Sequence, residues 1–405
     1  MRGPWGYAGP IAHWWEPCLL YCGPMLDWRY EGIIAGYVAL YEATGQRRWL
    51  DRAVAAAEDV VRRQLPDGSY WNSSFQFGAV EGGTPHEAAV DVGLLLLARV
   101  LRREGDPTAE RYLHAAERNL VEYHLGRLWN GAWFLDQSWN ETAVANKNAT
   151  TIEALLLLEA LTGRDLSTFL RGAAHLLLKA QVHEPGPRHG GTVHLGTGPD
   201  ALVISFYTAR CVSALAQLCE RFHDERYDRA LSDAVDFLAR QVEPAGLVFG
   251  YYRDGRRIAN PRWISPAAEV LRAFRSASRY RPVPHEVVDR LVRLLLQAQL
   301  PSGGIPTGWG SARRGFTGSP PEAPEFRDVL PVVGWCDKAF RALASLVDGP
   351  VDPRPPASTT VACTWKAWRC RYREEEDCLW LERQHDGRLL FRWWKGSVFP
   401  DVFDL

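Results

Sequence analysis

The sequence predicts an all-α fold in which helical hairpins stack in two concentric layers, with a small C-terminal antiparallel β appendage. Two observations predict the hairpins. Segments with the apolar period of a helix alternate with short turns that end on glycine, as at Gly45, Gly105 and Gly163. In each pair the first helix is apolar almost all round, whereas the second is amphipathic. The first helices are therefore expected inside and the second ones outside.

An internal repeat supports this interpretation. The second helix of four hairpins ends in glutamine, at Gln64, Gln181, Gln241 and Gln299, and His124 lies near the place of a missing fifth. The spacing corresponds to a period of about 59 residues over five hairpins and a sixth partial one. The expected helices are 29–45 with 47–64, 85–105 with 107–125, 147–163 with 165–182, 201–222 with 225–242, 265–280 with 284–299, and 333–347.

The chain divides near its C-terminus. Residues 1–348 are expected to form the helical domain, with 1–29 irregular, and 349–358 form a Pro-rich linker. Residues 359–405 alternate apolar and polar positions like three antiparallel strands, the last two meeting at a His-Asp-Gly turn. We expect this appendage to act as a lid or as a contact in a homo-oligomer rather than as an independent catalytic domain.

The composition is that of an ordinary soluble globular protein, with 46% apolar and 23% charged residues. A formal net charge of −1 gives no overall field that would attract nucleic acid or an anionic membrane. No apolar run is long enough to span a bilayer, and the N-terminus lacks the pattern of a signal peptide. The eight cysteines include no CxxC pair, which favours reduced thiols. A cytoplasmic location is therefore expected.

The stretch 127–153 concentrates residues that can carry chemistry. It is a turn-rich loop with carboxylates, amides and tryptophans, and it leads into an almost wholly apolar helix. The other long connections between hairpins gather Trp, Asp, His and Gly in the same way, at the end where the inner helices begin. We therefore expect a pocket at the N-termini of the inner helices, with aromatic rings that recognise a flat, partly apolar ligand.

Two segments carry a family resemblance. The joints YEATGQRRWLDRA (41–53) and LEALTGRDLSTFLRGA (158–173) resemble those of six-hairpin glycosidase-like (α/α)6 toroids. Residues 64–70, with their Gln, Gly and Tyr, resemble the repeat signature of terpenoid-cyclase and prenyltransferase toroids. The resemblance covers about 30–348 and implies an (α/α)6 toroid of helical hairpins. It implies little about chemistry, because one toroid hosts unrelated reactions.

The catalytic candidates are carboxylates, because sugar chemistry in such a barrel generally pairs a protonated acid with an ionised base or nucleophile. Asp136 and Glu141 come first because they lie in the densest loop. Glu87 and Asp91 share one face of an inner helix at positions i and i+4. Asp200 lies in another connection. For each of these acids the alternative is a helix cap or a structural ion pair.

Other polar and aromatic residues are expected around the same mouth. The substrate-binding candidates are Asp27, Arg29, Trp71, His86, Trp133, Trp139, Asn146, Lys147, His189, His194, Arg262, Trp263, Trp309, Asp328 and Trp335. Four further acids expected there are Glu31, Glu81, Glu269 and Asp337. His189 and His194 share a glycine-containing loop but lack a recognised metal-binding spacing, so neither a metal nor another cofactor is expected.

Three functions follow from these patterns. The first is a carbohydrate-active enzyme (a glycoside hydrolase, lyase or epimerase) acting on a small-molecule or oligosaccharide substrate. The second is a terpenoid cyclase, whose aromatic-lined bore would stabilise carbocations. The motifs Asp-x-Asp-Asp and Asp-Asp-x-x-Asp, which this family would carry, are absent. The third is a non-catalytic scaffold that keeps the toroid without its chemistry. No nucleic-acid partner is expected.

Overall fold

The computed structural model describes most of the helical region and the strands on either side of it. Backbone and side chains are described for Tyr7 and for residues 28–70, 88–139, 141–194, 201–299, 303–310 and 335–351. Backbone alone is described for 2–3, 6, 9–12, 19–22, 84–87, 360–365, 368–373, 378–383, 389–394 and 401–402. None of the helices in these ranges is long and apolar enough to cross a membrane.

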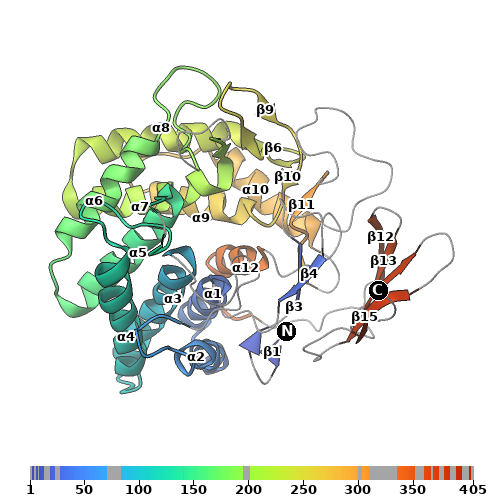
Figure 1. The fold of residues 1–405 in the computed structure, drawn as a ribbon, viewed down its shortest axis with the longest axis horizontal. Coiled ribbons are helices and arrows are strands. Elements are labelled where there is room, and N and C mark those ends of the chain that lie inside the picture. The colour runs from blue at the N-terminus through green and yellow to red at the C-terminus, as the bar shows by residue number, and fades with distance from the viewer. Residues whose placement is uncertain are drawn as a thin grey trace.

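The helices form a two-layered ring (Figure 1). The inner layer consists of α1 (Arg29–Thr44), α3 (Thr84–Arg103), α5 (Ala145–Thr162), α7 (Ser205–Phe222), α9 (Ala267–Ala277) and α12 (Cys336–Ala344). The outer layer consists of α2 (Arg47–Val61), α4 (Ala109–Arg118) continued by the π-helix η1 (Asn119–Leu128), α6 (Ser167–Ala180), α8 (Glu225–Gln241) and α10 (His285–Ala298). Each inner helix packs on the next, and α12 contacts both α9 and α1, which closes the ring.

The layering follows from the apolar patterns, as the sequence predicts. Inner helices such as α5 and α7 bury side chains on nearly every face, because they contact both inner neighbours and an outer helix. Outer helices such as α8 bury one stripe and leave the rest to solvent. The prediction of an (α/α)6 toroid is confirmed, and the helix bounds differ from the expected ones by only a few residues at most ends.

The repeated glutamines join neighbouring hairpins. The side-chain amide of Gln64 donates to the carbonyl oxygens of Gly68 at 2.9 Å and Ala115 at 2.8 Å. Gln181 repeats the arrangement with Gly190 at 3.2 Å and with Ala230 at 2.8 Å. In both cases one amide ties the loop after its own helix to the next outer helix, which gives the periodic glutamine a structural reason.

The sixth sector of the ring differs from the other five. Between α2 and α10, Figure 1 shows the short strands β1 (Arg2–Gly3), β3 (Gly9–Ala12) and β4 (Leu19–Cys22) at the level where the other sectors carry an outer helix. The Tyr7 hydroxyl lies 3.3 Å from that of Tyr37, and the Tyr7 amide donates to the Tyr30 hydroxyl at 3.0 Å. The expectation of an irregular 1–29 is therefore wrong where these strands form, since extended chain covers part of the exposed side of α1.

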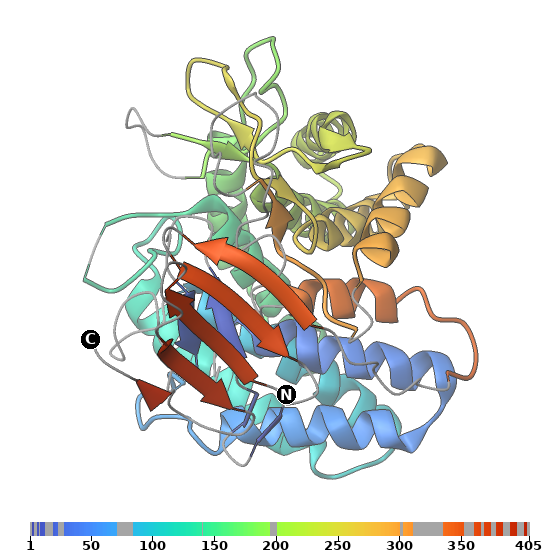
Figure 2. The ribbon, with the colours of Figure 1, turned by 90° about the vertical axis from the view of Figure 1, so that its right-hand side faces the viewer.

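The C-terminal appendage is a five-stranded antiparallel sheet rather than the expected three strands. Strands β12 (Thr360–Trp365) and β13 (Trp368–Arg373) are separated by only two residues, and Trp365 pairs with Trp368. Because the apolar–polar alternation continues across so short a connection, the sequence pattern reads as one strand. The remaining strands are β14 (Cys378–Arg383), β15 (Leu389–Trp394) and β16 (Asp401–Val402). Figures 1 and 2 place this sheet beside the barrel, next to β3 and β4.

A network of ion pairs fills the middle of the barrel. Glu31 of α1 accepts hydrogen bonds from Arg210 of α7 at 2.7 and 3.0 Å and from Lys338 of α12 at 2.7 Å. Arg341 of α12 also bonds Glu31. In the same network, Arg272 of α9 makes a bidentate pair with Glu153 of α5 at 2.9 and 3.1 Å and bonds Glu269 at 2.5 Å. We call these seven side chains the central network.

The central network keeps Glu31 and Glu269 ionised although both are buried. Burial by itself would raise the pKa of Glu31, but Arg210 and Lys338 hold it well below its usual range. The pKa of Glu269 falls to about 2 against the same effect of burial, chiefly because of Arg272. Each charge is compensated by at least one opposite charge on another helix, so the network links five of the six inner helices.

Substituting Glu31 tests this dependence. Glu31→Gln should lower the free energy of unfolding by about 3–5 kcal/mol, because three buried cations lose their shared carboxylate. Denaturant unfolding followed by circular dichroism measures the change. The control is Asp51→Asn, which breaks the exposed pair with Arg47 on α2 and should cost less than about 1 kcal/mol. Equal effects of the two substitutions would contradict a central role for Glu31.

Candidate functional site

The connections between hairpins gather at the N-terminal ends of the inner helices and form small sheets there. One contains β5 (Val203–Ile204), β8 (Gly250–Tyr251) and β9 (Arg257–Ile258). Another contains β6 (Val242–Glu243), β7 (Gly246–Leu247), β10 (Arg262–Trp263) and β11 (Gly308–Trp309). These sheets hold the loops in fixed positions, so side chains at this mouth are presented by an ordered framework.

The loop before α5 is fastened to the first turn of that helix. The side chain of Asn148, fully buried, accepts from the Phe134 amide at 3.0 Å and donates to the Phe134 carbonyl at 2.8 Å. The Asp136 amide donates to the Thr142 carbonyl at 2.6 Å. These bonds satisfy the loop backbone and place the Asp136 side chain beside the start of α5.

Asp136 forms an ion pair with Lys147, two residues into α5 from Ala145. Both side chains are only 13% exposed. Burial lowers the pKa of the Lys147 ammonium, while the carboxylate of Asp136 opposes that change. A buried lysine with a lowered pKa can exchange a proton more readily than an exposed one, and its carboxylate partner can accept a proton from a ligand.

His194 lies next to this pair. Its Nδ1 is 3.2 Å from the side-chain oxygen of Asn146, and its ring lies 4.2 Å from the ring of Tyr207, centroid to centroid. Burial, and to a smaller extent the charge of Lys147, lower the pKa of His194 to about 3. The imidazole is therefore neutral at physiological pH, with one nitrogen able to donate and the other to accept a hydrogen bond. Asp136, Asn146, Lys147 and His194 together are called the α5 cluster.

A row of aromatic rings runs from the α5 cluster across the mouth. Tyr207 contacts Phe206 at 4.2 Å between centroids, Phe206 contacts Trp335 at 4.7 Å, and Trp335 contacts Trp28 at 4.6 Å. The guanidinium of Arg29 lies 4.2 Å over the Trp28 ring. This aromatic row, Tyr207–Phe206–Trp335–Trp28, connects the first turns of α7, α12 and α1 in an unbroken series of contacts.

Asp337, in the first turn of α12, is a buried acid at the far end of the row. Burial raises its pKa to about 6, although Lys338, 3.1 Å away, opposes the shift. Its side chain lies against Gly32 of α1, where an added Cβ would come within 2.4 Å of the carboxylate oxygen. It borders a cavity of about 190 Å³ that Arg29 and Tyr37 also line. The sequence places Asp337 among the mouth acids, but only the packing reveals its raised pKa.

The remaining predicted residues are spread more widely. Asp91 is fully buried in α3 and accepts a hydrogen bond from the Tyr70 hydroxyl at 2.8 Å. Glu141 is exposed, and Trp139 is 69% exposed. Arg262 pairs with Glu243 at 2.9 Å, while its neighbour Trp263 is fully buried beneath Phe206.

Several other candidates have structural partners or lie outside the described residues. His189 lies 3.6 Å from Asp233, and Lys179 lies 5.1 Å over the ring of Trp133. Trp309 pairs with Arg262 in the mouth sheet. Glu31 and Glu269 lie in the first turns of α1 and α9, and their side chains take part in the central network. Asp27, Trp71, Glu81, Asp200 and Asp328 lie outside the described residues, as do the side chains of His86 and Glu87 at the start of α3.

The chain is similar in fold to several solved enzymes, although no family model and no curated protein matches its sequence. A D-mannose isomerase matches with a TM-score of 0.58 and 14% identity over 80% of this chain and 87% of the other. A cellobiose 2-epimerase from Bacillus thermoamylovorans B4167 matches with a TM-score of 0.60 and 12% identity, over 81% and 92%. An unsaturated glucuronyl hydrolase specific for heparin matches at 0.55 and 11%, over 84% and 89%. These similarities show a six-hairpin glycosidase-like (α/α)6 toroid fold.

The neutral state of His194 can be tested by NMR. The imidazole resonances that disappear in His194→Asn should not shift between about pH 5 and pH 8, because the pKa lies near 3. In Lys147→Met the pKa should rise somewhat but stay below its usual value, since burial is the larger cause. A His194 signal that titrates near the usual histidine value, about 6.5, would contradict the buried position beside Lys147.

Proposed function

We propose that this protein is a carbohydrate-active enzyme whose site lies at the inner-helix N-termini. One observation carries the proposal: the α5 cluster, with an acid, an amide, a lysine and a neutral histidine, stands directly beside a row of aromatic rings. A sugar has hydroxyl groups at its edge and C–H groups on its faces. It therefore needs directional polar partners together with flat apolar surfaces, and this mouth offers both.

The geometry suggests a separate role in catalysis or binding for each polar group. Asp136 would act as the base or nucleophile, and Lys147, which is already hydrogen-bonded to it, would bind or protonate the oxygen on which charge develops. Asn146 and the neutral His194 would hydrogen-bond sugar hydroxyls. Tyr207 and Trp335, at separate points of the aromatic row, would contact the face of the ring.

A glycosidase mechanism needs a second carboxyl group that is protonated when the substrate binds. Asp337 has the property required, because burial raises its pKa to about 6. Glu141, Glu87, Asp91 and Asp200 remain candidates from the sequence. An epimerase or isomerase needs only a base and an acid on either side of a carbon adjacent to a carbonyl, and Asp136 with Lys147 or His194 could supply these. A hydrolase, lyase or epimerase is therefore the proposed class.

The alternatives fit these contacts less well. A terpenoid substrate would place hydrocarbon against Lys147, Asp136 and Asn146 and would offer no partner for their polar groups, which is costly. Only the aromatic row favours it. A retired scaffold would have no need for a buried lysine and a buried neutral histidine side by side, whereas groups with shifted pKa values gather at working sites.

Substitution of the two acids that the sequence ranks first tests the site. Asp136→Asn and Glu141→Gln should each lower kcat by about 10²–10⁴-fold, with a melting temperature within a few degrees of the wild type. In Asp136→Asn the amide oxygen can still accept from Lys147, which preserves the local fold. Activity is measured by NMR on a panel of aldoses, ketoses, disaccharides and unsaturated uronides, which detects isomerisation, epimerisation and bond cleavage together.

The matched control is Asp51→Asn on the outer surface, which should keep full activity. Wild-type turnover in both Asp136→Asn and Glu141→Gln would remove these residues from the mechanism. A wild-type protein that is inactive on every sugar in the panel but cyclises linear isoprenoids would replace the proposal with the terpenoid alternative.

A further inference from the structure

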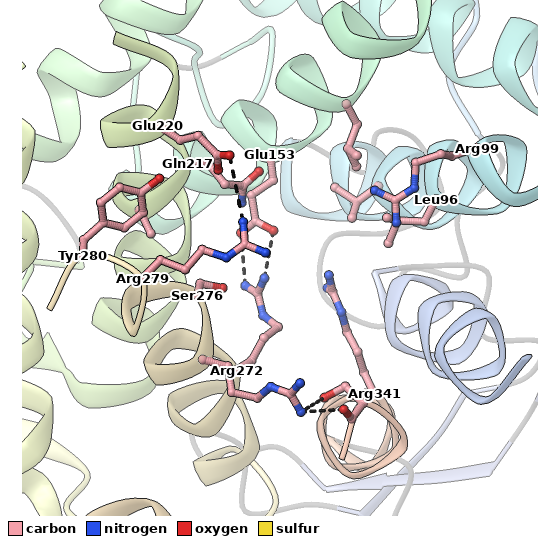
Figure 3. A pocket seen from close by; sticks show the side chains of 15 residues that line it. Leu96, Arg99, Glu153, Gln217, Glu220, Arg272, Ser276, Arg279, Tyr280 and Arg341 are labelled. Carbon is pink, nitrogen blue, oxygen red and sulfur yellow. Dashed lines mark hydrogen bonds and ion pairs between the residues drawn. The ribbon is translucent and has the colours of Figure 1, made fainter. Parts of the chain in front are cut away.

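A second cavity lies at the opposite end of the barrel, where the inner helices end (Figure 3). It has a volume of about 400 Å³ and is lined from α3, α5, α7, α9 and α12. Glu153, Arg272 and Arg341 of the central network form its inner end, and the other lining residues of α5, α7, α9 and α12 come after the network residues along those helices. The network therefore lies between this cavity and the mouth that holds the α5 cluster. A cavity of this size accommodates a molecule as large as a substituted monosaccharide.

Arginine dominates the charged lining of this cavity. The five arginines are Arg99, Arg272, Arg275, Arg279 and Arg341, and the two acids are Glu153 and Glu220. Arg272 and Arg341 form the floor and belong to the central network. With Asp337, which lies against Lys338, that network contains four acids and four basic groups and is balanced by itself. The outer part of the cavity keeps three arginines against Glu220, a surplus of two positive charges.

The need to neutralise helix ends explains only one of these three arginines. Arg275 donates to the Ser345 carbonyl at the C-terminus of α12 at 2.5 Å. Arg99 is exposed and makes no hydrogen bond or ion pair with any residue that the structure describes. Arg279 is 76% exposed, and its nearest acid is the Glu220 carboxylate at 3.9 Å. In Figure 3, Arg99 projects from one wall and Arg279 from the other.

We propose that this cavity binds a small molecule carrying a phosphate group, held between Arg99 and Arg279. A phosphate monoester carries a charge of about −1.5 to −2 at pH 7, which matches the local surplus, whereas a single carboxylate would neutralise only about half of it. A guanidinium group can donate two parallel hydrogen bonds to two oxygens of one phosphate. The volume left over accommodates the rest of the molecule, beside Gln217 and Ser276.

This site is independent of the proposed sugar chemistry at the other mouth. It shares none of the residues of the α5 cluster, and binding can be measured without any substrate. Loss of phosphate binding would leave the proposed function untouched, and an inactive Asp136→Asn protein should bind phosphate as the wild type does. The two proposals can therefore fail separately.

The test is titration of the full-length chain with inorganic phosphate by isothermal calorimetry, with ionic strength held constant by sodium chloride. We expect saturable phosphate binding at one site per chain. This binding should be tighter than that of glucuronate, a sugar that carries a single carboxylate. Arg99→Gln and Arg279→Gln should each weaken phosphate binding at least about tenfold. Both residues are exposed, so neither substitution should disturb folding, and the unchanged circular dichroism melting curve verifies this.

The control is Arg47→Gln, which removes an exposed arginine from the outer helix α2 and should leave the phosphate affinity unchanged. Three results would overturn the proposal. One is the absence of saturation up to about 10 mM phosphate. Another is equal affinity in the wild type and both cavity variants. The third is tighter binding of glucuronate than of phosphate, which would show that the surplus charge does not select a dianion.

Discussion

The shared hydrogen bonding of Glu31 is the interaction on which the inner ring depends. Its carboxylate accepts hydrogen bonds from Arg210, Lys338 and Arg341, which lie on two other helices. Ion pairs of Arg210 and Arg272 extend the network to Glu153 and Glu269. A buried charge without a partner is far more costly than a buried apolar side chain. The network therefore fixes the rotation of the five helices that carry it, because any other rotation would leave at least one of these charges unpaired.

The same network gives the two ends of the barrel different characters. Toward the helix N-termini, the lining changes to aromatic rings, amides and the Asp136–Lys147 pair. Toward the C-termini it changes to arginines that exceed the available acids. One closed ring thus presents two ends with different chemistry. This separation arises because the charged middle is balanced within itself and leaves each end free to carry its own set of side chains.

The α5 cluster also depends on neighbouring residues that hold its side chains in position. Asn148 holds the preceding loop by two hydrogen bonds to Phe134, and the first turn of α5 presents Asn146 and Lys147 from a rigid helix. His194 comes from a different connection, between α6 and α7, and is held by its backbone bond to Leu202 and by Tyr207. A site assembled from two loops and two helix starts has little freedom to move, which suits a group of polar side chains that must act together.

The sequence by itself determined the hairpins, their two layers and the end of the barrel at which the polar loops gather. These features follow from local periodicity and glycine turns, which act over short distances along the chain, and from the glutamines that recur at a fixed spacing. The density of polar residues in 127–153 also singles out Asp136, Asn146 and Lys147, because all three lie within one short stretch of chain. The sequence did not predict that the first β segment divides into β12 and β13, because the apolar–polar alternation continues through their two-residue connection.

Only the tertiary structure decided which charges face one another. Glu31 and Arg341 are separated by 310 positions yet share a hydrogen bond, and no periodicity relates them. The lowered pKa of His194 and the raised pKa of Asp337 likewise come from burial by distant segments. The arginines of the second cavity lie on or just after three inner helices, and each by itself reads as an ordinary surface residue. Charge and burial act through space, so their combination becomes visible only when the ring is closed.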